Sequence, residues 1–483
     1  MGIARSRPQM HWPRDCSEKI GCCTAIDVNS IFLFPAALSL LPHNVIGLAK
    51  MLSVSTSRNK LVKSLLGIWL ICAAATMAFA EPWTQFRGIH RDGISQETGL
   101  WNLVQNSDPK LEWMAEGVGN GYASVSVVDG RVFTTGNTQD AQSVTALSTK
   151  DGKVLWTQPI SQRKPKHGYE GSRSTPTVDG DRLYVCGSDG SIVCLGIANG
   201  ELKWRRDFSD WQGKMMNGWG FSESPLVDGD LVLCTPGSNQ AMIVALNKTT
   251  GQEIWSTKMD DTWKDKKELK DGAGYSSIVV SNGGGVKQYV QLVGRGVIGV
   301  RASDGELLWR YTRVGNMTAN IPSVIASGDS IFCSTGYNTG SALLKLTQDG
   351  KDRVSMEEVY FLDSKTLQNK HGGMVLVDGH IYCGHGNGSG MPICVEMKSG
   401  NIAWGPERNT GKGESSVAYA DGHVVYRFQD GTVAIVKADP KKYEVIRSFK
   451  PAFQEKESWS YPAISDGMLY LREQNKVMCY RLR

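Results

Sequence analysis

Apolar and polar residues recur along the chain in units of roughly 43 to 54 residues. Each unit holds short runs in which apolar and polar positions alternate, and Asp-Gly, Asn-Gly or Thr-Gly pairs separate the runs. Alternation of this kind predicts half-buried β-strands, and the glycine pairs predict tight hairpin turns. The clearest units begin at Ser174 and Glu223, pass through an Asp-Gly pair, and end at Trp204 and Trp255.

Units of this length built from short strands are typical of the blades of a β-propeller. The turn after the innermost strand is found in eight copies, at Asp129, Asp179, Asp228, Asn282, Asp329, Asp378, Asp421 and Asp466. The last copy stops near Tyr480 without a fourth strand, whereas Leu111-Glu112-Trp113 precedes the first copy and matches the strand that ends a unit elsewhere. We therefore expect an all-β, eight-bladed β-propeller of four-stranded antiparallel blades, whose ring is closed by pairing this N-terminal strand with the last blade.

A tryptophan ends most copies, at Trp156, Trp204, Trp255, Trp309 and Trp404. We expect these indole rings to pack between neighbouring blades, where a large flat side chain can bury on the order of 150–250 Å². Stability alone therefore explains why tryptophan recurs.

The first eighty residues do not carry the repeat. A basic segment with Lys60 and Lys63 precedes an apolar run at 65–77, which ends in Ala78-Phe79-Ala80. This order is typical of a secretory signal that is cleaved after Ala80. A competing interpretation, an apolar anchor within 31–48, is interrupted by prolines.

Met51 stands where such a signal should begin. We expect the native chain to start at Met51, so that residues 1–50 are an upstream extension. A signal peptide at 51–80, an N-terminal extension at 81–110 and the propeller at 111–483 follow. We expect an exported protein of the periplasm or the cell surface, with no transmembrane span in the mature chain.

The composition is that of an ordinary globular protein, with 41% hydrophobic and 21% charged residues among 483. The net charge of +5 is small and scattered, which argues against nucleic acid as a partner, and we expect a monomer. Seven cysteines follow Ala80, so they cannot all pair within one chain. The pairs Cys186/Cys194 and Cys383/Cys394 each flank one hairpin, and are either small core residues or disulfides.

The segment from Ala245-Leu246 through Gly251 to Trp255 resembles the PQQ-like (quinoprotein-like) β-propeller repeat. Residues 83–88 and Arg91-Asp92-Gly93 resemble the opening of exported BamB-like members. The resemblance covers residues 81–483 and implies one of two functions. One is a quinoprotein alcohol dehydrogenase with pyrroloquinoline quinone (PQQ) and calcium on the axis, and the other is an outer-membrane assembly scaffold without a cofactor.

The dehydrogenases that the chain resembles hold their quinone between a tryptophan and a disulfide of adjacent cysteines. The adjacent pair in this sequence is Cys22-Cys23, upstream of the expected cleavage site, and the sequence has no Cys-x-x-Cys-His haem motif. We therefore favour a binding or scaffold module with no catalytic residues and no cofactor. It would hold a protein or peptide partner at a propeller rim or a blade edge.

The alternative is a PQQ- and calcium-dependent dehydrogenase that oxidises an alcohol or a sugar. Among the residues that open the innermost strands, most of them serine, Glu223 and Asn320 stand out, and a carboxylate with an amide suits calcium. Arg173, Lys412 and Trp459 lie in the same loops and would contact the quinone. The simpler interpretation is that these polar residues line a water-filled channel.

Overall fold

The computed structural model describes residues 82–260 and 269–483, which belong to one unit of the chain, Ala78–Arg483. The predicted upstream extension, signal peptide and cleavage site at 1–80 lie outside the described residues. Within these residues, no helix is long and apolar enough to cross a membrane.

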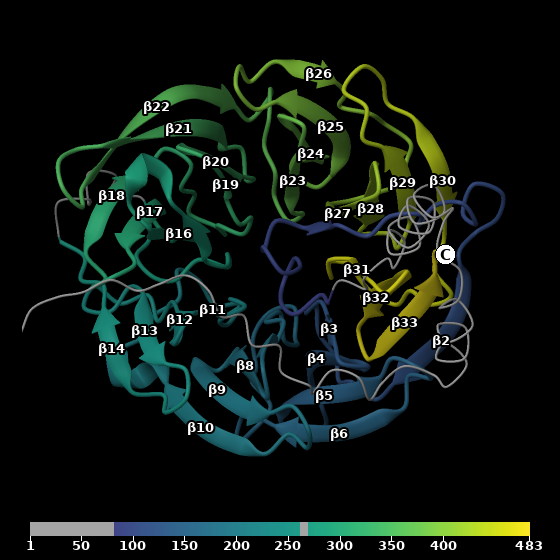
Figure 1. Cartoon of the computed structure of the whole chain (residues 1–483), viewed down its shortest axis with the longest axis horizontal. Coiled ribbons are helices and arrows are strands. Elements are labelled where there is room, and N and C mark those ends of the chain that lie inside the picture. The colour runs from purple at the N-terminus through teal and green to yellow at the C-terminus, as the bar shows by residue number, and fades with distance from the viewer. Residues whose placement is uncertain (1–81, 261–268) are drawn as a thin grey trace, which may run out of the picture. The chain divides into compact units, whose positions relative to one another are not determined.

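In the described residues, eight antiparallel sheets of short strands stand around a ring (Figure 1), which confirms the predicted eight-bladed propeller. Blade one holds β3 Ser126–Val128, β4 Arg131–Asn137, β5 Gln142–Ser148 and β6 Val154–Pro159; blade two holds β7 Thr177–Asp179, β8 Arg182–Gly187, β9 Ser191–Gly196 and β10 Leu202–Asp207; blade three holds β11 Leu226–Asp228, β12 Leu231–Cys234, β13 Val244–Asn247 and β14 Glu253–Ser256; blade four holds β15 Val279–Ser281, β16 Gln288–Val293, β17 Gly296–Arg301 and β18 Leu307–Tyr311.

The remaining blades follow in chain order. Blade five holds β19 Ile325–Ser327, β20 Ser330–Thr335, β21 Gly340–Gln348 and β22 Val354–Asp363; blade six holds β23 Met374–Val377, β24 His380–His385, β25 Met391–Glu396 and β26 Ile402–Trp404; blade seven holds β27 Ser415–Ala420, β28 His423–Phe428, β29 Val433–Lys437 and β30 Val445–Phe449; blade eight holds β31 Ala463–Ser465, β32 Met468–Glu473, β33 Lys476–Arg481 and β2 Lys110–Glu116. A short strand, β1 Ile94–Ser95, adds in parallel to β27, and 3₁₀ turns lie at η1 Phe208–Trp211 and η3 Gly283–Gly285.

The ring closes as the sequence predicts. Strand β2 pairs antiparallel with β33, and Trp113 lies opposite Cys479. The outer strand of the last blade therefore comes from the beginning of the propeller, so the edges of that blade are as well paired as those of its neighbours.

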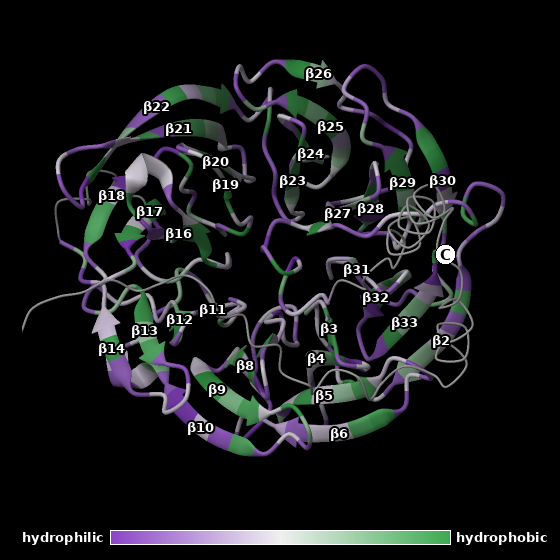
Figure 2. Ribbon diagram, in the orientation of Figure 1, coloured by the Kyte–Doolittle hydropathy of each residue, from purple (hydrophilic) through white to green (hydrophobic). Residues whose placement is uncertain are grey.

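Hydrophobic positions, green in Figure 2, follow the strands, and they form cores that are shared by adjacent blades. The tryptophans interlock these blades as expected. The ring of Trp156 in blade one covers Gly200 in blade two, and its Nε1 donates a hydrogen bond to the Ile197 carbonyl at 3.1 Å. In blade five Tyr360 takes this place and donates to the Met397 carbonyl at 2.6 Å.

In blades two to four, a hydroxyl residue just ahead of the inner strand accepts a backbone N–H from the preceding blade. The backbone N–H of Ser124 donates to Thr175 Oγ1 at 3.0 Å, that of Thr175 to Ser224 Oγ at 2.9 Å, and that of Ser224 to Ser277 Oγ at 3.0 Å. These bonds satisfy backbone groups that would otherwise face the axis without a strand partner.

Cysteines in the described residues are free and buried. Cys186 pairs across the hairpin with Ile192, whereas Cys194 pairs with Tyr184, so the two cysteines are offset by two positions rather than opposite. They pack as small apolar residues between blades two and three.

Candidate functional site

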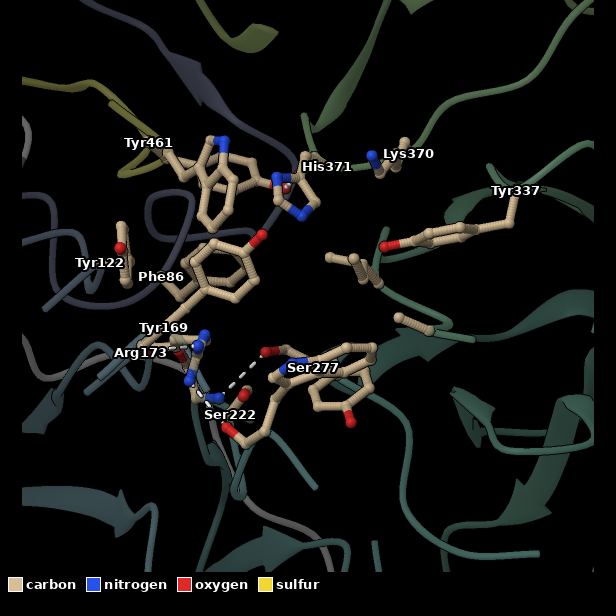
Figure 3. Close-up of a pocket in the computed structure, with 16 residues that line it drawn as sticks. Phe86, Tyr122, Tyr169, Arg173, Ser222, Ser277, Tyr337, Lys370, His371 and Tyr461 are labelled. Carbon is tan, nitrogen blue, oxygen red and sulfur yellow. Dashed lines mark hydrogen bonds between the residues drawn. The ribbon is translucent and has the colours of Figure 1, made fainter. Parts of the chain in front are cut away.

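A cavity of ≈ 170 Å³ opens on the axis of the ring, among the loops that lead into the inner strands (Figure 3). It is lined by Phe86, Tyr122, Tyr169, Arg173, Trp219, Ser222, Ser224, Tyr275, Ser277, Ala319, Ile321, Tyr337, Lys370, His371, Trp459 and Tyr461. Half of these described side chains are phenylalanine, tyrosine or tryptophan. Flat apolar walls with a few polar groups are typical of sites that bind small molecules.

Trp459 is the centre of the aromatic wall. The centroid of its ring lies 5.1 Å from that of Tyr122, 4.9 Å from that of Tyr169 and 4.3 Å from that of His371. Its Nε1 donates to Gln429 Oε1 at 3.1 Å, which fixes the plane of the indole.

Arg173 supplies a cation to the wall on the blade-two side. Its guanidinium lies 5.6 Å from the Tyr122 ring and donates to the carbonyl oxygens of Trp219 at 2.8 Å and Tyr169 at 2.7 Å. Burial lowers its pKa to about 10, so Arg173 still carries its charge at neutral pH.

Lys370 supplies a second cation, from the blade-six side (Figure 3). Its Nζ lies 3.5 Å from Glu414 Oε1 and 5.0 Å from the centre of the Tyr337 ring. The carboxylate of Glu414 is buried behind the wall and also accepts the N–H of Gly388. Burial raises the pKa of Glu414 despite the neighbouring ammonium group.

His371, next to Lys370, is a neutral group in the wall. Burial, together with the positive charges of Lys370 and Arg173, lowers its pKa to about 3. Its backbone carbonyl accepts the hydroxyl of Tyr461 at 2.8 Å, but its ring Nδ1 has no hydrogen-bond partner in the described residues. The imidazole therefore contributes a buried, unsatisfied nitrogen to the wall.

The N-terminal extension crosses the axis beside the cavity. Trp83 pairs with Val127 of blade one, Arg91 donates to the Ser224 carbonyl of blade three at 2.7 Å, and the Gly93 carbonyl accepts an N–H from blade seven. We call residues 82–101 the crossing segment, because it spans the axis between these blades (Figure 1). Phe86 from this segment lines the cavity, so the segment forms part of its wall.

Two buried arginines fix the crossing segment. Arg87 donates to the Met374 carbonyl of blade six, and Arg91 also reaches the Pro225 carbonyl at 3.0 Å. Burial lowers the pKa of Arg91 to about 10, and the nearby Glu223 partly offsets this effect. The motif that resembles the opening of BamB-like proteins thus ties blades three and six together across the axis.

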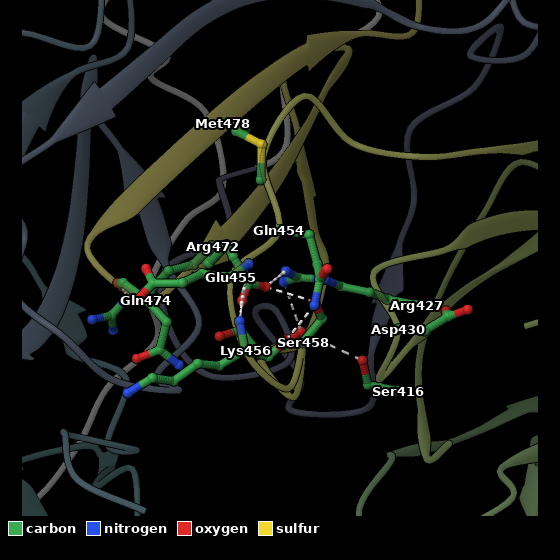
Figure 4. Close-up of polar contacts among 12 residues, drawn as sticks. Ser416, Arg427, Asp430, Gln454, Glu455, Lys456, Ser458, Arg472, Gln474 and Met478 are labelled. Atoms are coloured by element: carbon green, nitrogen blue, oxygen red, sulfur yellow. Dashed lines mark hydrogen bonds and ion pairs between the residues drawn. The ribbon is translucent and has the colours of Figure 1, made fainter. Parts of the chain in front are cut away.

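A hydrogen-bonded network holds the loop that carries Trp459 (Figure 4). Glu473 Oε2 accepts bonds from Arg427 Nη2 at 2.9 Å and from Ser458 Oγ at 2.6 Å, and its Oε1 accepts the N–H of Lys456 at 3.1 Å. Arg427 and Glu473 are each 1% exposed. This ion pair joins blades seven and eight and fixes the residue before Trp459.

The structure brings together two of the three residues predicted to contact a quinone. Arg173 and Trp459 line the cavity. Lys412 is exposed and does not belong to the described lining residues.

The predicted metal ligands lie one position out of register with the cavity. Glu223 falls between Ser222 and Ser224, which line it, and Asn320 likewise falls between two lining residues. Successive side chains of an extended segment point to opposite sides. Glu223 and Asn320 therefore point into the blades.

Both side chains are already engaged there. Glu223 Oε2 accepts the Thr235 N–H at 2.6 Å, and burial raises the pKa of Glu223 to about 8, so it is largely protonated at neutral pH. Asn320 Oδ1 accepts two bonds from Asn316, at 3.1 and 2.8 Å. Calcium requires several free, charged oxygen ligands, and this pair does not fit that requirement. The described residues contain no group of three or more His, Cys, Asp or Glu side chains that could hold a metal ion.

Most of the aromatic wall was absent from the sequence-based prediction, including Tyr122, Trp219, Tyr275 and Tyr461. The repeat contained a signal for three of these four residues. Tyr275 and Tyr461 are next to the serine that opens an inner strand, and Tyr122 lies two positions before such a serine. Tyr337 and Lys370 come from loops that vary between blades and carried no such signal.

The family model described as outer membrane protein assembly factor BamB matches residues 96–214 and 140–406. An outer membrane protein assembly factor BamB from Kangiella koreensis is 33% identical over 116 residues, which cover 23% of this chain and 26% of that protein. The chain spans about a quarter of the length of the curated relatives it matches.

Two solved structures share the fold at low sequence identity. BamB from Moraxella catarrhalis has a TM-score of 0.53 and 11% identity, and the match covers 78% of this chain and 98% of that one. Quinohemoprotein alcohol dehydrogenase from Comamonas testosteroni has a TM-score of 0.59 and 13% identity, with 86% and 82% covered. Because the matched family model spans more than half of the sequence, the chain belongs to the family of PQQ-like β-propellers described as outer membrane protein assembly factor BamB.

Proposed function

We propose that this protein acts after export as a binding and scaffold module that holds a protein partner at the open rim of the propeller, without catalysing a reaction. The observation that carries the proposal is the composition of the axial cavity. In its described lining, the polar side chains are hydroxyls, two cations and a neutral imidazole. Such groups bind and orient a ligand, but they do not provide a charged base or a metal site.

The crossing segment supports the same function. Since the crossing segment lies across the axis, we infer that a partner or ligand approaches from the opposite rim. Tyr169 and Met317 are each 52% exposed at this rim, which provides apolar contacts for a protein surface. The matched family is described as an outer membrane protein assembly factor, which is in keeping with a protein partner.

The alternative, a PQQ-dependent dehydrogenase, is supported by the flat cationic cavity and by the likeness to quinohemoprotein alcohol dehydrogenase. It is disfavoured by Glu223 and Asn320, whose oxygens serve this chain's own hydrogen bonds.

Two measurements test the proposal. A photo-activated cross-linker in place of Met317 should yield one discrete, identifiable adduct in producing cells, whereas the same cross-linker in place of Leu155, on the outer strand β6, should not. The purified full chain, mixed with PQQ and calcium, should not reduce dye with any alcohol. Dye reduction that depends on PQQ, or equal adducts at both positions, would overturn the proposal.

A further inference from the structure

We propose that the axial cavity binds the terminal residue of an acidic saccharide, a sugar chain that carries carboxylate or sulfate groups. This inference assigns a ligand to the cavity and adds to the proposed scaffold function, which concerns the rim. It rests on the shape of the cavity walls, their charge, their side chains that can hydrogen-bond to sugar hydroxyls, and the groove beside the cavity.

The aromatic walls suit the shape of a sugar ring. The rings of Tyr122 and Tyr169 each pack against that of Trp459, with centroids 5.1 and 4.9 Å away and planes tilted by 36° and 59°, so together they form an angled aromatic wall. A pyranose presents a flat face of C–H groups, which packs on such rings, and hydroxyl groups around its edge. The volume of ≈ 170 Å³ suits a single ring of this size.

The charge of the cavity selects an anion. Arg173 and Lys370 lie on different sides of it (Figure 3), and the described lining contains no acidic side chain. The carboxylate nearest to Lys370, that of Glu414, is buried and shared with a backbone N–H. A guanidinium and an ammonium group bind carboxylate and sulfate by charge-assisted hydrogen bonds.

Other groups in the wall can form hydrogen bonds with the hydroxyl groups of a sugar, of which an aromatic acid has few or none. The neutral imidazole of His371 has an unpartnered Nδ1, and the hydroxyl of Tyr337 points into the cavity (Figure 3). Ser277 Oγ accepts a backbone N–H and retains its own proton for donation. Imidazole and hydroxyl groups can both donate and accept, as sugar hydroxyls do.

A polar groove of ≈ 1140 Å³ gives the rest of the chain a place to lie. It shares a wall with the cavity, because Gly218 and Gly220 line the groove while Trp219 between them lines the cavity. Its charged lining is mixed: Arg205 is paired with Asp189 and Asp207, Asp140 adds a third carboxylate, and the other cations are Arg163, Lys164 and Lys166, next to the amide of Gln162. These groups suit the hydroxyls and charges of a glycan, whereas a peptide would need a strand edge or apolar pockets.

The test is a binding titration of the full chain, followed by tryptophan emission and calorimetry. The ligands are an oligogalacturonate, a sulfated galactan oligosaccharide, a neutral galactan oligosaccharide of equal length, 4-hydroxybenzoate and an oligoglutamate peptide. We expect at least one acidic saccharide to bind, at least tenfold more tightly than the neutral one. Binding by 4-hydroxybenzoate or oligoglutamate alone, or equal affinity for the acidic and neutral saccharides, would overturn the inference.

Variants locate the site. Arg173→Gln and Lys370→Gln should each weaken binding of the acidic saccharide at least tenfold, and Tyr337→Phe should weaken it less. Lys412→Gln, the matched change of an exposed lysine outside the cavity, should leave binding unchanged. Unchanged binding in both Arg173→Gln and Lys370→Gln would place the ligand elsewhere and overturn the inference. The cross-linking at Met317 would be unaffected by that outcome, so failure of this inference and of the scaffold function are distinguishable.

Discussion

The indole of Trp113 covers Gly152, the glycine of the outer turn in blade one. A Cβ atom on Gly152 would lie 2.6 Å from the Trp113 ring, and Trp113 Nε1 donates to the Thr149 carbonyl at 2.8 Å. The same arrangement joins Trp156 to Gly200 within the array. Blade eight is therefore packed against blade one by the same contact that joins blades one and two, although its outer strand β2 comes from the beginning of the propeller.

Trp113→Ala should weaken the packing of blade eight against blade one and lower the free energy of unfolding. Loss of a buried indole costs about 3–5 kcal/mol, out of a typical total of about 5–15 kcal/mol. Urea unfolding of the variant should show this loss in the free energy of unfolding. Met114→Ala, at the neighbouring and 42% exposed position of β2, is the control and should change little. Equal effects of the two changes would contradict the role of Trp113.

Gly152→Ala should destabilise the protein more than Gly180→Ala. Both glycines have positive φ, +69° and +57°, which costs an L-residue about 1–2 kcal/mol. Gly180 has open space around its Cα, whereas a methyl group on Gly152 would collide with Trp113. Thermal unfolding of the two variants separates the backbone cost from the cost of the lost contact. A midpoint for Gly152→Ala at or above that of Gly180→Ala would contradict the interlock.

Glu473→Gln should loosen the loop that carries Trp459. Removing one partner of a buried ion pair costs about 3–5 kcal/mol, because the other charge remains buried without compensation. We expect a lower free energy of unfolding and a shifted Trp459 emission. The double change Arg427→Met and Glu473→Met should recover part of the stability but not the emission, because Ser458 still lacks its acceptor. If stability and emission recovered together, Glu473 would not position the loop.

The pH dependence of stability should reflect Glu223. Its pKa is raised from 4.5 to about 8 by burial, so between these values the native state binds a proton that the unfolded state has released. The stabilisation from this proton is complete below pH 4.5 and is lost as the pH rises to about 8, with a slope of at most ~1.4 kcal/mol per pH unit. Glu223→Gln should remove this slope.

The measurement is urea unfolding of the native protein and Glu223→Gln at pH 5, 6, 7 and 8. The difference between their free energies of unfolding cancels the titration of groups common to both. As the pH rises, the free energy of unfolding of the native protein should fall steadily relative to that of Glu223→Gln. A constant difference would show that Glu223 is ionised in the folded state.

The fold was predictable because each of its rules is local. Alternating residues give strands, Asp-Gly pairs give hairpins, and a terminal tryptophan follows at a fixed distance, so eight copies confirm one another. The closing strand at Trp113 was also predictable, because the eighth copy of the repeat lacks a fourth strand and this segment matches that strand.

The cavity was less predictable because its geometry depends on a shift of one residue. The sequence placed Glu223 and Asn320 in it, but alternation along an extended segment gives those positions to Ser222 and Ala319. The crossing segment was recognisable only by resemblance. Its arginines contact residues more than a hundred positions away, such as Arg91 with Ser224, and no local period records such a contact.

Pairing of β2 with β33 also sets an order of events during synthesis. The strand at Lys110–Glu116 leaves the ribosome early, and its partner at Lys476–Arg481 comes more than three hundred and fifty residues later. Until then the ring stays open, and blades one and eight each lack a neighbour. Exposed strand edges and apolar surface of this kind favour aggregation. Loss of β33 would therefore leave β2 without its partner and the ring unclosed.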